Sequence, residues 1–402
     1  MKITLVTSTL GGGGAERVAV TMANYWAAKG WEVTILTTFA GEPALSYSLD
    51  SRVAHLLPGA KSVDNPITDP EESLPMIDLL NSCSQPERDV LLRHGAHILN
   101  LRRAILRTRP AVVISFMDFN NNCVLAATLG LGLKVIVSEH CDPNQNFIGD
   151  GWERLRRRLY PQASCVAVLT EESLRFFSSF AGIRRRVIPN PVTPAVFTSS
   201  DEPPTQKNGK TLISMGRLSS EKGFDLLLSS FAVLADRHSE WTLEILGEGP
   251  LRRHLESRVR SLSLSGRVRL PGFDLRPFDA LRRADLFAMS SLSEGFPNAL
   301  LEAMACGLPV VSFDCPSGPR HIIRNGIDGV LVPPRDDRAL AAALDRLMGD
   351  EAERKRLGGR ALEVADRFGV ERVMSMWNEL VLECAPPQEL NSAIESPTEL
   401  RC

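Results

Sequence analysis

The same succession of strand, glycine turn and helix occurs at the start of the chain and again in its second half. Residues 3–7 are apolar or β-branched, residues 11–14 are glycines, and a helical pattern with one apolar face starts near Ala15. Residues 211–215 repeat the strand pattern, and a glycine-containing turn and an amphipathic helix follow them. Strands that alternate with helices favour parallel sheets. The repeat therefore predicts an α/β chain with two similar lobes.

The 402 residues are enough for two domains of ordinary size. We expect a first lobe over residues 1–190 and a second over residues 211–366. Residues 191–210 are rich in Pro, Ser and Thr and predict a linker. Residues 58–90 have weak periodicity and predict a long, variable connection, which leaves open whether they form a lid or an acceptor site. The polar residues 383–402 predict a disordered tail.

Composition excludes several classes of protein. A formal net charge of −2 argues against a nucleic-acid binder, and 44% hydrophobic with 23% charged residues predicts a soluble globular chain. Met1 and Lys2 run straight into a strand pattern without a signal sequence, and no run of about 18 apolar residues predicts a membrane span. Eight cysteines without a Cys-x-x-Cys pair suggest neither a disulfide scaffold nor a zinc site. We expect a cytoplasmic protein.

Residues 294–307 predict a seat for a phosphate. Pro297 suits the first position of a helix, and Gly307 followed by Pro309 ends that helix. The turn before the helix leaves the N–H groups of Phe296, Asn298 and Ala299 without intrahelical partners, at the positive end of the helix dipole. Such a helix start binds anions.

Two glutamates flank this predicted seat. Side chains on a helix lean toward its N-terminus, so Glu302 reaches back toward the seat, where its carboxylate can accept two hydrogen bonds from the diol of a ribose. Glu294 stands at the mouth and can accept from a second polyol. The alternative is a solvated helix face, since surface glutamates are common. One phosphate seat between two polyol acceptors fits a sugar nucleotide.

Arg217 and Lys222 flank the strand-to-helix turn that opens the second lobe. Arginine offers a planar fork to phosphate and lysine a point charge, so together they can neutralise a diphosphate. The alternative is two exposed basic residues without a ligand.

The glycine turn of the first lobe also lets backbone approach a phosphate closely. It does not fit the dinucleotide fingerprint, because Glu16 or Arg17 stands where the third glycine would be, and the strand over residues 32–37 ends without an acidic residue. An oxidoreductase is therefore disfavoured, and an ordinary turn between strand and helix remains the alternative.

Asp118 and His140 follow predicted strands over residues 112–117 and 135–138. Ligands of open parallel sheets bind beyond the carboxyl ends of the strands, so both residues stand where substrate chemistry can occur. The alternative for His140 is a capping or internally bonded histidine.

Two basic clusters occur in the first lobe. Ile98, Leu101 and Ile105 mark one face of a predicted helix, and residues 152–160 mix aromatic residues with arginine. Such helices suit an anionic membrane surface or the diphosphate of a lipid carrier, and a solvated charged face is the alternative. The arginines of the two clusters are Arg102, Arg103, Arg107, Arg109, Arg154, Arg156, Arg157 and Arg158.

Four motifs together resemble the retaining glycosyltransferases of family 4. These are Gly13-Gly14-Ala15-Glu16-Arg17, Ser138-Glu139-His140, the R-x4-K pair Arg217 and Lys222, and the E-x7-E pair Glu294 and Glu302. The chain is most similar to bacterial enzymes that extend lipid-linked oligosaccharides or build exopolysaccharide and O-antigen. The resemblance implies the GT-B fold, in which two Rossmann-like lobes face an inter-domain cleft. It also implies that a last helix, over residues 367–382, returns to the first lobe.

The resemblance implies a nucleotide-sugar donor, with UDP-hexose or UDP-N-acetylhexosamine expected, and a role for each site residue. His140, Glu294, Arg217 and Lys222 would be the catalytic residues, and the acceptor would be a glycan or a polyprenyl-diphosphate-linked glycan at the inner face of the cell membrane. No metal is expected, because the chain has no Asp-x-Asp sequence. The donor contacts would be Gly13, Gly14, Arg217, Lys222, Phe273, Glu294, Phe296, Pro297, Asn298, Ala299 and Glu302. The acceptor contacts would be Glu16, Asp118, His140, Arg102 and Arg103.

Two other functions remain open at this point. A nucleotide-sugar epimerase of the same fold is disfavoured by the basic first lobe, since a soluble small substrate needs no membrane dock. A scaffold subunit without activity is disfavoured by the intact Arg217, Lys222, Glu294 and Glu302. The four consecutive glycines and the long segment 58–90 depart from the family pattern and leave the acceptor side unassigned.

Overall fold

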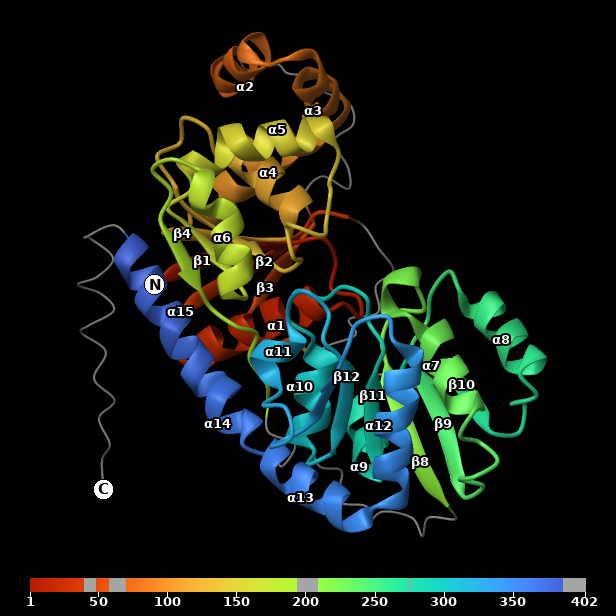
Figure 1. Cartoon of the computed structure of the whole chain (residues 1–402). Coiled ribbons are helices and arrows are strands. Elements are labelled where there is room, and N and C mark those ends of the chain that lie inside the picture. The colour runs from red at the N-terminus through yellow and green to blue at the C-terminus, as the bar shows by residue number, and fades with distance from the viewer. Residues whose placement is uncertain (40–47, 58–69, 194–208, 275, 386–402) are drawn as a thin grey trace, which may run out of the picture. The chain divides into compact units, whose positions relative to one another are not determined.

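The computed structural model describes residues 1–39, 48–57, 70–193, 209–274 and 276–385 (Figure 1). Contacts divide the chain into two units. Unit 1 comprises Met1–Pro189 and the described residues from Val373 onward, and unit 2 comprises Asn190–Arg372. The chain thus passes between the units twice. Most of the predicted linker and of the predicted tail lies outside the described residues.

Unit 1 is built on a seven-stranded parallel sheet with the order β3-β2-β1-β4-β5-β6-β7. The central strands are buried on both faces, which is why they read as continuous apolar runs in the sequence. Val6 of β1 pairs with Leu36 on one side and Ser115 on the other. The strands are β1 Lys2–Thr7, β2 Glu32–Thr37, β3 Ala54–Leu56, β4 Val112–Phe116, β5 Lys134–Glu139, β6 Cys165–Val168 and β7 Arg185–Val187.

Helices cover this sheet, and most of the C-terminal helix α15 also belongs to unit 1. The indole of Trp26 in α1 donates to Asn378 Oδ1 of α15 over 2.7 Å, and Arg186 Nη2 of β7 lies 3.0 Å from Glu383 Oε2 of α15. The helices are α1 Gly14–Ala28, α2 Pro70–Ser82, α3 Gln85–Thr108, α4 Asp118–Ala127, α5 Asp150–Leu159, α6 Glu171–Phe176 and α15 Val370–Cys384.

Unit 2 is built on a six-stranded parallel sheet with the order β10-β9-β8-β11-β12-β13. Its strands are β8 Lys210–Met215, β9 Trp241–Leu246, β10 Val268–Gly272, β11 Leu286–Met289, β12 Val310–Phe313 and β13 Val330–Val332. Its helices are α7 Phe224–Ala232, α8 Arg252–Ser261, α9 Pro277–Arg283, α10 Asn298–Ala305, α11 Pro319–Ile322, α12 Asp337–Gly349, α13 Glu351–Ala361 and α14 Val364–Phe368.

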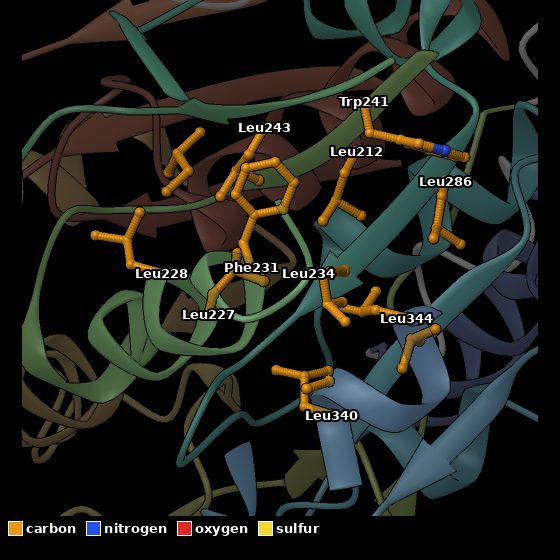
Figure 2. Packing of buried hydrophobic residues seen from close by; sticks show 14 of the residues in the cluster. Leu212, Leu227, Leu228, Phe231, Leu234, Trp241, Leu243, Leu286, Leu340 and Leu344 are labelled. Carbon is orange, nitrogen blue, oxygen red and sulfur yellow. The ribbon is translucent and has the colours of Figure 1, made fainter. Parts of the chain in front are cut away.

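The core of unit 2 forms where α7 and α12 pack on the sheet. Figure 2 shows Phe231 of α7 and Leu340 of α12 in one apolar cluster with Leu212 of β8 and Leu286 of β11. All four side chains are fully buried. Each such side chain contributes about 1.5–3 kcal/mol to folding, so this apolar layer fixes the strands whose ends carry the site.

The strand order reverses once in each sheet, between β1 and β4 in unit 1 and between β8 and β11 in unit 2. Loops on the two sides of such a reversal diverge and leave a crevice at the carboxyl ends of the strands, where α/β proteins bind ligands. The three predicted phosphate-binding turns follow β1, β8 and β11, and each of these strands borders one of the reversals.

The predicted pair of parallel α/β lobes is confirmed, and strand β2 has the predicted bounds. The interpretation of residues 58–90 as a connection is wrong where the structure describes them, because α2 and the start of α3 lie there. Glu87 accepts a hydrogen bond from the Ser84 N–H over 2.7 Å and caps α3, and Leu79 and Leu91 are buried. Residues 58–69 lie outside the described part of the chain.

Among the described helices, none combines the length and the hydropathy that crossing a membrane requires.

Candidate functional site in unit 2

An ion pair joins the two loops that flank the strand reversal of unit 2. Lys222 Nζ lies 2.7 Å from Glu294 Oε1, and the Ser291 hydroxyl donates to the same oxygen over 2.6 Å. The side chains of Lys222 and Glu294 are 22% and 11% exposed, so a ligand can still reach both groups. Lys222 comes from the loop after β8, and Glu294 from the loop after β11.

Close backbone packing holds these two loops together. Gly223 has φ +60°, and a Cβ at this position would collide with the carbonyl oxygen of Ser290. The Ser290 hydroxyl donates to the Lys222 carbonyl over 2.9 Å, and the Leu292 N–H donates to the Glu221 carbonyl over 2.7 Å. Only glycine permits this approach, so the Glu-Lys-Gly sequence has a backbone role beside its charge.

Lys222 carries its positive charge over the whole physiological range. Burial opposes the charged form, but the negative charge of Glu294 and its hydrogen bond outweigh burial, so the pKa of Lys222 is raised above its ordinary value. The pair therefore keeps a fixed cation next to the carboxyl group of Glu294.

Arg217 is exposed, and its guanidinium makes no hydrogen bond or ion pair within the part of the chain that the structure describes. Its backbone is fixed, since the Leu218 N–H donates to the Glu248 carbonyl over 2.9 Å. A Cβ on Gly247 would collide with the Gly216 carbonyl, so the next loop packs tightly against this one. A cation on a fixed loop without a partner is suited to an anionic ligand.

Helix α10 begins one residue later than predicted. Pro297 is the residue that precedes the helix, with φ −72° and ψ 109°, and Asn298 is its first residue. The N–H groups of Phe296 and Ala299 donate to no acceptor in the described ranges. At the other end Gly307 has φ +74°, and the Leu308 N–H donates to the Ala303 carbonyl over 3.1 Å.

The remaining predicted donor residues differ in exposure. Glu302 is 5% exposed within α10, and Phe296 is 5% exposed because its ring packs edge-on against Phe368 with centroids 5.3 Å apart. Phe273, which follows β10, is 47% exposed. The Phe296 side chain is thus a core group, and its backbone is the part that a ligand can use.

Sequence reasoning missed three residues that support this site. Asn190 was predicted to end the first lobe, but it belongs to unit 2, where its side-chain amide donates to the Phe296 carbonyl over 3.1 Å and to Asn298 Oδ1 over 2.9 Å. The Ser317 hydroxyl donates to the Gly295 carbonyl over 3.3 Å. Ser291 bonds Glu294 as described above. Of these, only Ser291 carried a sequence signal, because it stands three residues before Glu294.

In unit 1, His140 is held between a hydroxyl and a ring. Its Nε2 lies 3.0 Å from Ser138 Oγ, and its ring lies 5.3 Å from that of Phe116 between centroids. Nδ1 is buried without a hydrogen-bond partner among the described residues. Burial lowers the pKa of His140 to about 4, so the imidazole is neutral at neutral pH.

Asp118 and Arg156 belong to a buried network rather than to a surface. Arg156 is 0% exposed and lies 3.8 Å from Asp118, 4.0 Å from Glu139 and 3.3 Å from Glu153. Tyr160 donates to Glu139, and Asp118 is 8% exposed. The predicted membrane role of Arg156 is wrong, because a guanidinium with three carboxylate neighbours in the interior cannot meet a lipid. Asp118 also accepts from Asn146 Nδ2 over 2.5 Å, and its contact with an acceptor stays a prediction from the sequence.

Arg102 has a structural role. It is 8% exposed, and its guanidinium donates to the carbonyls of Ala127 and Leu129 over 2.9 and 2.8 Å, which satisfies the end of α4. The prediction that Arg102 contacts an acceptor is therefore wrong. Arg103, on the next position of α3, is partly exposed.

The glycine loop of unit 1 already holds an acidic group. A Cβ on Gly13 would collide with the carboxylate of Glu16, which folds back over the start of α1. Burial raises the pKa of Glu16, and a hydrogen bond from its own backbone opposes this. A diphosphate at Gly13 and Gly14 would have to displace this carboxylate.

Among the described residues, no group of three or more His, Cys, Asp or Glu side chains is placed to hold a metal ion.

Comparison with known sequence families divides the chain in two. The family described as Glycosyltransferase Family 4 matches residues 12–196. The family described as Glycosyl transferases group 1 matches residues 197–364. The change from one match to the next falls close to the boundary between units 1 and 2.

Individual proteins match over nearly the whole chain. An exopolysaccharide phosphotransferase of Streptomyces coelicolor is 30% identical over 92% of this chain, which spans only 39% of that relative's length. An α-1,4-N-acetyl-D-galactosaminyltransferase of Campylobacter jejuni, named for an undecaprenyl-diphosphate-linked acceptor, is 28% identical over 95% of this chain and 99% of its own. The crystal structure of Anabaena HepE with UDP and glucose has a TM-score of 0.76 at 18% identity, over 95% of this chain and 100% of that one. The last likeness confirms the predicted two-lobed fold.

Proposed function

Because the chain belongs to the glycosyltransferases of the GT-B fold, we propose that it moves a sugar from a nucleotide sugar to a glycan acceptor with retention of configuration. The chain is a hexosyltransferase, and its relatives are named for bacterial exopolysaccharide and lipid-linked glycan synthesis. For the substrates, we propose a UDP-hexose or UDP-N-acetylhexosamine as the donor and a lipid-linked glycan or a polysaccharide as the acceptor. The observation that carries this proposal is the Lys222–Glu294 pair at the strand reversal of unit 2, with Arg217 on the same loop after β8 and without a partner among the described residues.

The donor site in this proposal is unit 2. Arg217, Lys222 and the amides of Phe296 and Ala299 bind the diphosphate, Glu294 holds the donor sugar and Glu302 the ribose. Phe273 lies next to the base. The UDP complexes of HepE support UDP as the nucleotide of a chain with this fold. The contact of Gly13 and Gly14 with the diphosphate stays a prediction from the sequence.

The same groups supply catalysis. As the bond between the sugar carbon and the diphosphate breaks, negative charge grows on the leaving group, and cations and amides fixed beforehand stabilise it. The acceptor hydroxyl then bonds to that carbon on the same face, and its proton passes to the departing diphosphate, so no carboxylate base is required. His140, as a neutral imidazole, orients the donor and the acceptor. We propose that no metal is needed, because Arg217 and Lys222 supply the positive charge.

On the acceptor side, His140, Glu16, Asp118 and Arg103 remain the proposed contacts. The acceptor named for the Campylobacter relative supports a polyprenyl-diphosphate-linked glycan. Arg107, Arg109, Arg154, Arg157 and Arg158 are exposed on unit 1 and would attract the anionic inner face of the cell membrane. Each basic residue at such a surface contributes about 1 kcal/mol.

A panel of nucleotide sugars tests the proposal. The purified protein is screened by thermal shift against UDP-, GDP- and ADP-sugars, and the stabilising donors are then assayed for nucleotide release with polyprenyl-diphosphate-linked glycans, with and without EDTA. We expect UDP-sugars to raise the melting temperature, and UDP release that depends on the acceptor and persists in EDTA. Absence of stabilisation by every nucleotide sugar would contradict the donor assignment, and loss of turnover in EDTA would contradict metal-independent transfer.

A further inference from the structure

We propose that Asn190 is a positioning residue of the nucleotide-sugar site, which ties the first passage of the chain between the units to the phosphate-binding turn of unit 2. The inference rests on the proposed function. It assigns to Asn190 no contact with substrate. Asn190 acts through the turn over residues 295–299.

The side chain of Asn190 is buried at 4% exposure and makes two bonds to this turn. Its Nδ2 donates to the carbonyl of Phe296 over 3.1 Å and to Oδ1 of Asn298 over 2.9 Å. A backbone carbonyl can only accept, so the amide must present Nδ2 to it whichever way the Asn298 amide is turned. The orientation of Asn190 is therefore fixed by its partners.

This orientation has a cost. Oδ1 of Asn190 is buried and has no hydrogen-bond partner among the described residues. An unsatisfied buried acceptor typically destabilises a protein by about 1–3 kcal/mol. We therefore expect the two bonds of Asn190 to serve function, and these bonds hold Phe296 and Asn298 at the start of α10.

The second passage of the chain between the units meets the same turn. The Val192 N–H donates to the Phe368 carbonyl over 2.8 Å, and Val192 forms a parallel bridge with Gly369. The Phe368 ring packs on Phe296. Both passages are thus joined to each other and to the turn, one by a polar and one by an aromatic contact.

The consequence concerns the amides that would bind phosphate. The Phe296 carbonyl and the Asn298 side chain lie in the turn whose N–H groups at Phe296 and Ala299 have no acceptor among the described residues. Without Nδ2 of Asn190 the Phe296 carbonyl and the Asn298 side chain lose their shared donor, so the turn that places the N–H groups of Phe296 and Ala299 is less rigidly held. The affinity for the nucleotide diphosphate then falls, because the amides must be ordered at the moment of binding.

The test compares Asn190→Leu, which keeps the size of the side chain without its amide or any new charge, with Asn325→Leu. Asn325 lies in the same unit and accepts one bond from the Leu331 N–H over 2.9 Å, so its variant loses an asparagine hydrogen bond away from the turn. UDP affinity is measured by calorimetry, and KM is measured separately for donor and acceptor. Asn190→Ser is the second variant if the leucine variant does not fold.

We expect the Asn190 variants to weaken UDP binding at least tenfold and to raise KM for the donor, with KM for the acceptor within twofold of wild type. The Asn325 variant keeps the wild-type affinity for UDP. Equal UDP affinity of wild type and the Asn190 variants overturns the inference and leaves the proposed function standing. A wild-type protein that binds neither UDP nor any nucleotide sugar overturns the proposed function, and the inference with it.

Discussion

Lys222 Nζ and Glu294 Oε1 lie 2.7 Å apart across the point where the strand order of unit 2 reverses, although 72 residues separate them in the sequence. The pair joins the R-x4-K and E-x7-E motifs into one site. Arg217, on the same loop as Lys222, has no partner among the described residues. The site therefore combines an ion pair with a second positive charge that no described carboxylate compensates.

Removing Lys222 should cost both stability and activity. Lys222→Met leaves the carboxylate of Glu294 largely buried without its cation, so we expect the free energy of unfolding in urea to fall by about 1–3 kcal/mol. UDP release should fall at least a hundredfold, the usual size for one preorganised donor. Lys355→Met removes a surface pair with Glu351, whose side chains are 77% and 61% exposed, and should change stability by less than about 0.5 kcal/mol. Equal effects of the two substitutions would contradict the special role of Lys222.

His140 should make the protein sensitive to acid. Its pKa is lowered from 6.5 to about 4 by burial, so between these values the unfolded chain binds more protons than the folded one. The stability is then fully present above pH 6.5 and falls as the pH decreases through this window, by up to about 3 kcal/mol from this one group. His140→Gln should show a smaller fall in urea unfolding between pH 6.5 and 4. Parallel curves for the two proteins would show that His140 is protonated in the folded state.

Substitution of Arg156 should lower the free energy of unfolding as strongly as substitution of a core residue. Arg156→Met leaves Asp118, Glu139 and Glu153 without their shared cation, and breaking a buried pair in this way typically costs about 3–5 kcal/mol. Arg154 is on the same helix and exposed, so Arg154→Met should stay within about 0.5 kcal/mol of wild type. Urea unfolding of both variants measures the difference. A stable Arg156→Met protein would contradict the buried network.

The membrane hypothesis needs variants that leave the fold intact, and Arg156 is therefore unsuitable for it. Arg154→Glu combined with Arg157→Glu changes two exposed charges of α5. We expect weaker cosedimentation with vesicles containing anionic lipid at low salt, and little change in thermal stability, because each basic residue contributes about 1 kcal/mol at such a surface. Arg253→Glu, an exposed position in unit 2, serves as the control. Unchanged vesicle binding of the double variant would reject this surface as the dock.

The strands of both sheets were predictable because buried parallel strands are continuous apolar runs. The bounds of β2 came directly from such a run. The motif residues could be placed at strand ends for the same reason, since each follows a run. The helix α2 and the start of α3 were missed because Pro75 and several polar residues interrupt the helical period, while tertiary contacts of Leu79 and Leu91 stabilise it.

The environment of individual side chains could not be predicted. The sequence around Arg102 and Arg156 resembles that around exposed arginines. Arg102 binds Ala127, 25 residues away in the sequence, and Arg156 lies near Asp118, 38 residues away, so neither contact could be read from the local sequence. The left-handed backbone of Met117, with φ +76° at the end of β4, has no signal in the sequence either. Strain of this kind is usual beside ligand sites and is set by the surrounding fold.

The binding of UDP to wild type, Arg217→Ala and Arg253→Ala, followed by calorimetry, addresses the donor site most directly. Both arginines are exposed and neither side chain has a partner in the described residues, so both variants should fold as the wild type does. We predict that Arg217→Ala weakens UDP binding tenfold or more and that Arg253→Ala leaves it unchanged. Equal UDP affinity of all three proteins would show that the nucleotide diphosphate does not bind at the strand reversal of unit 2.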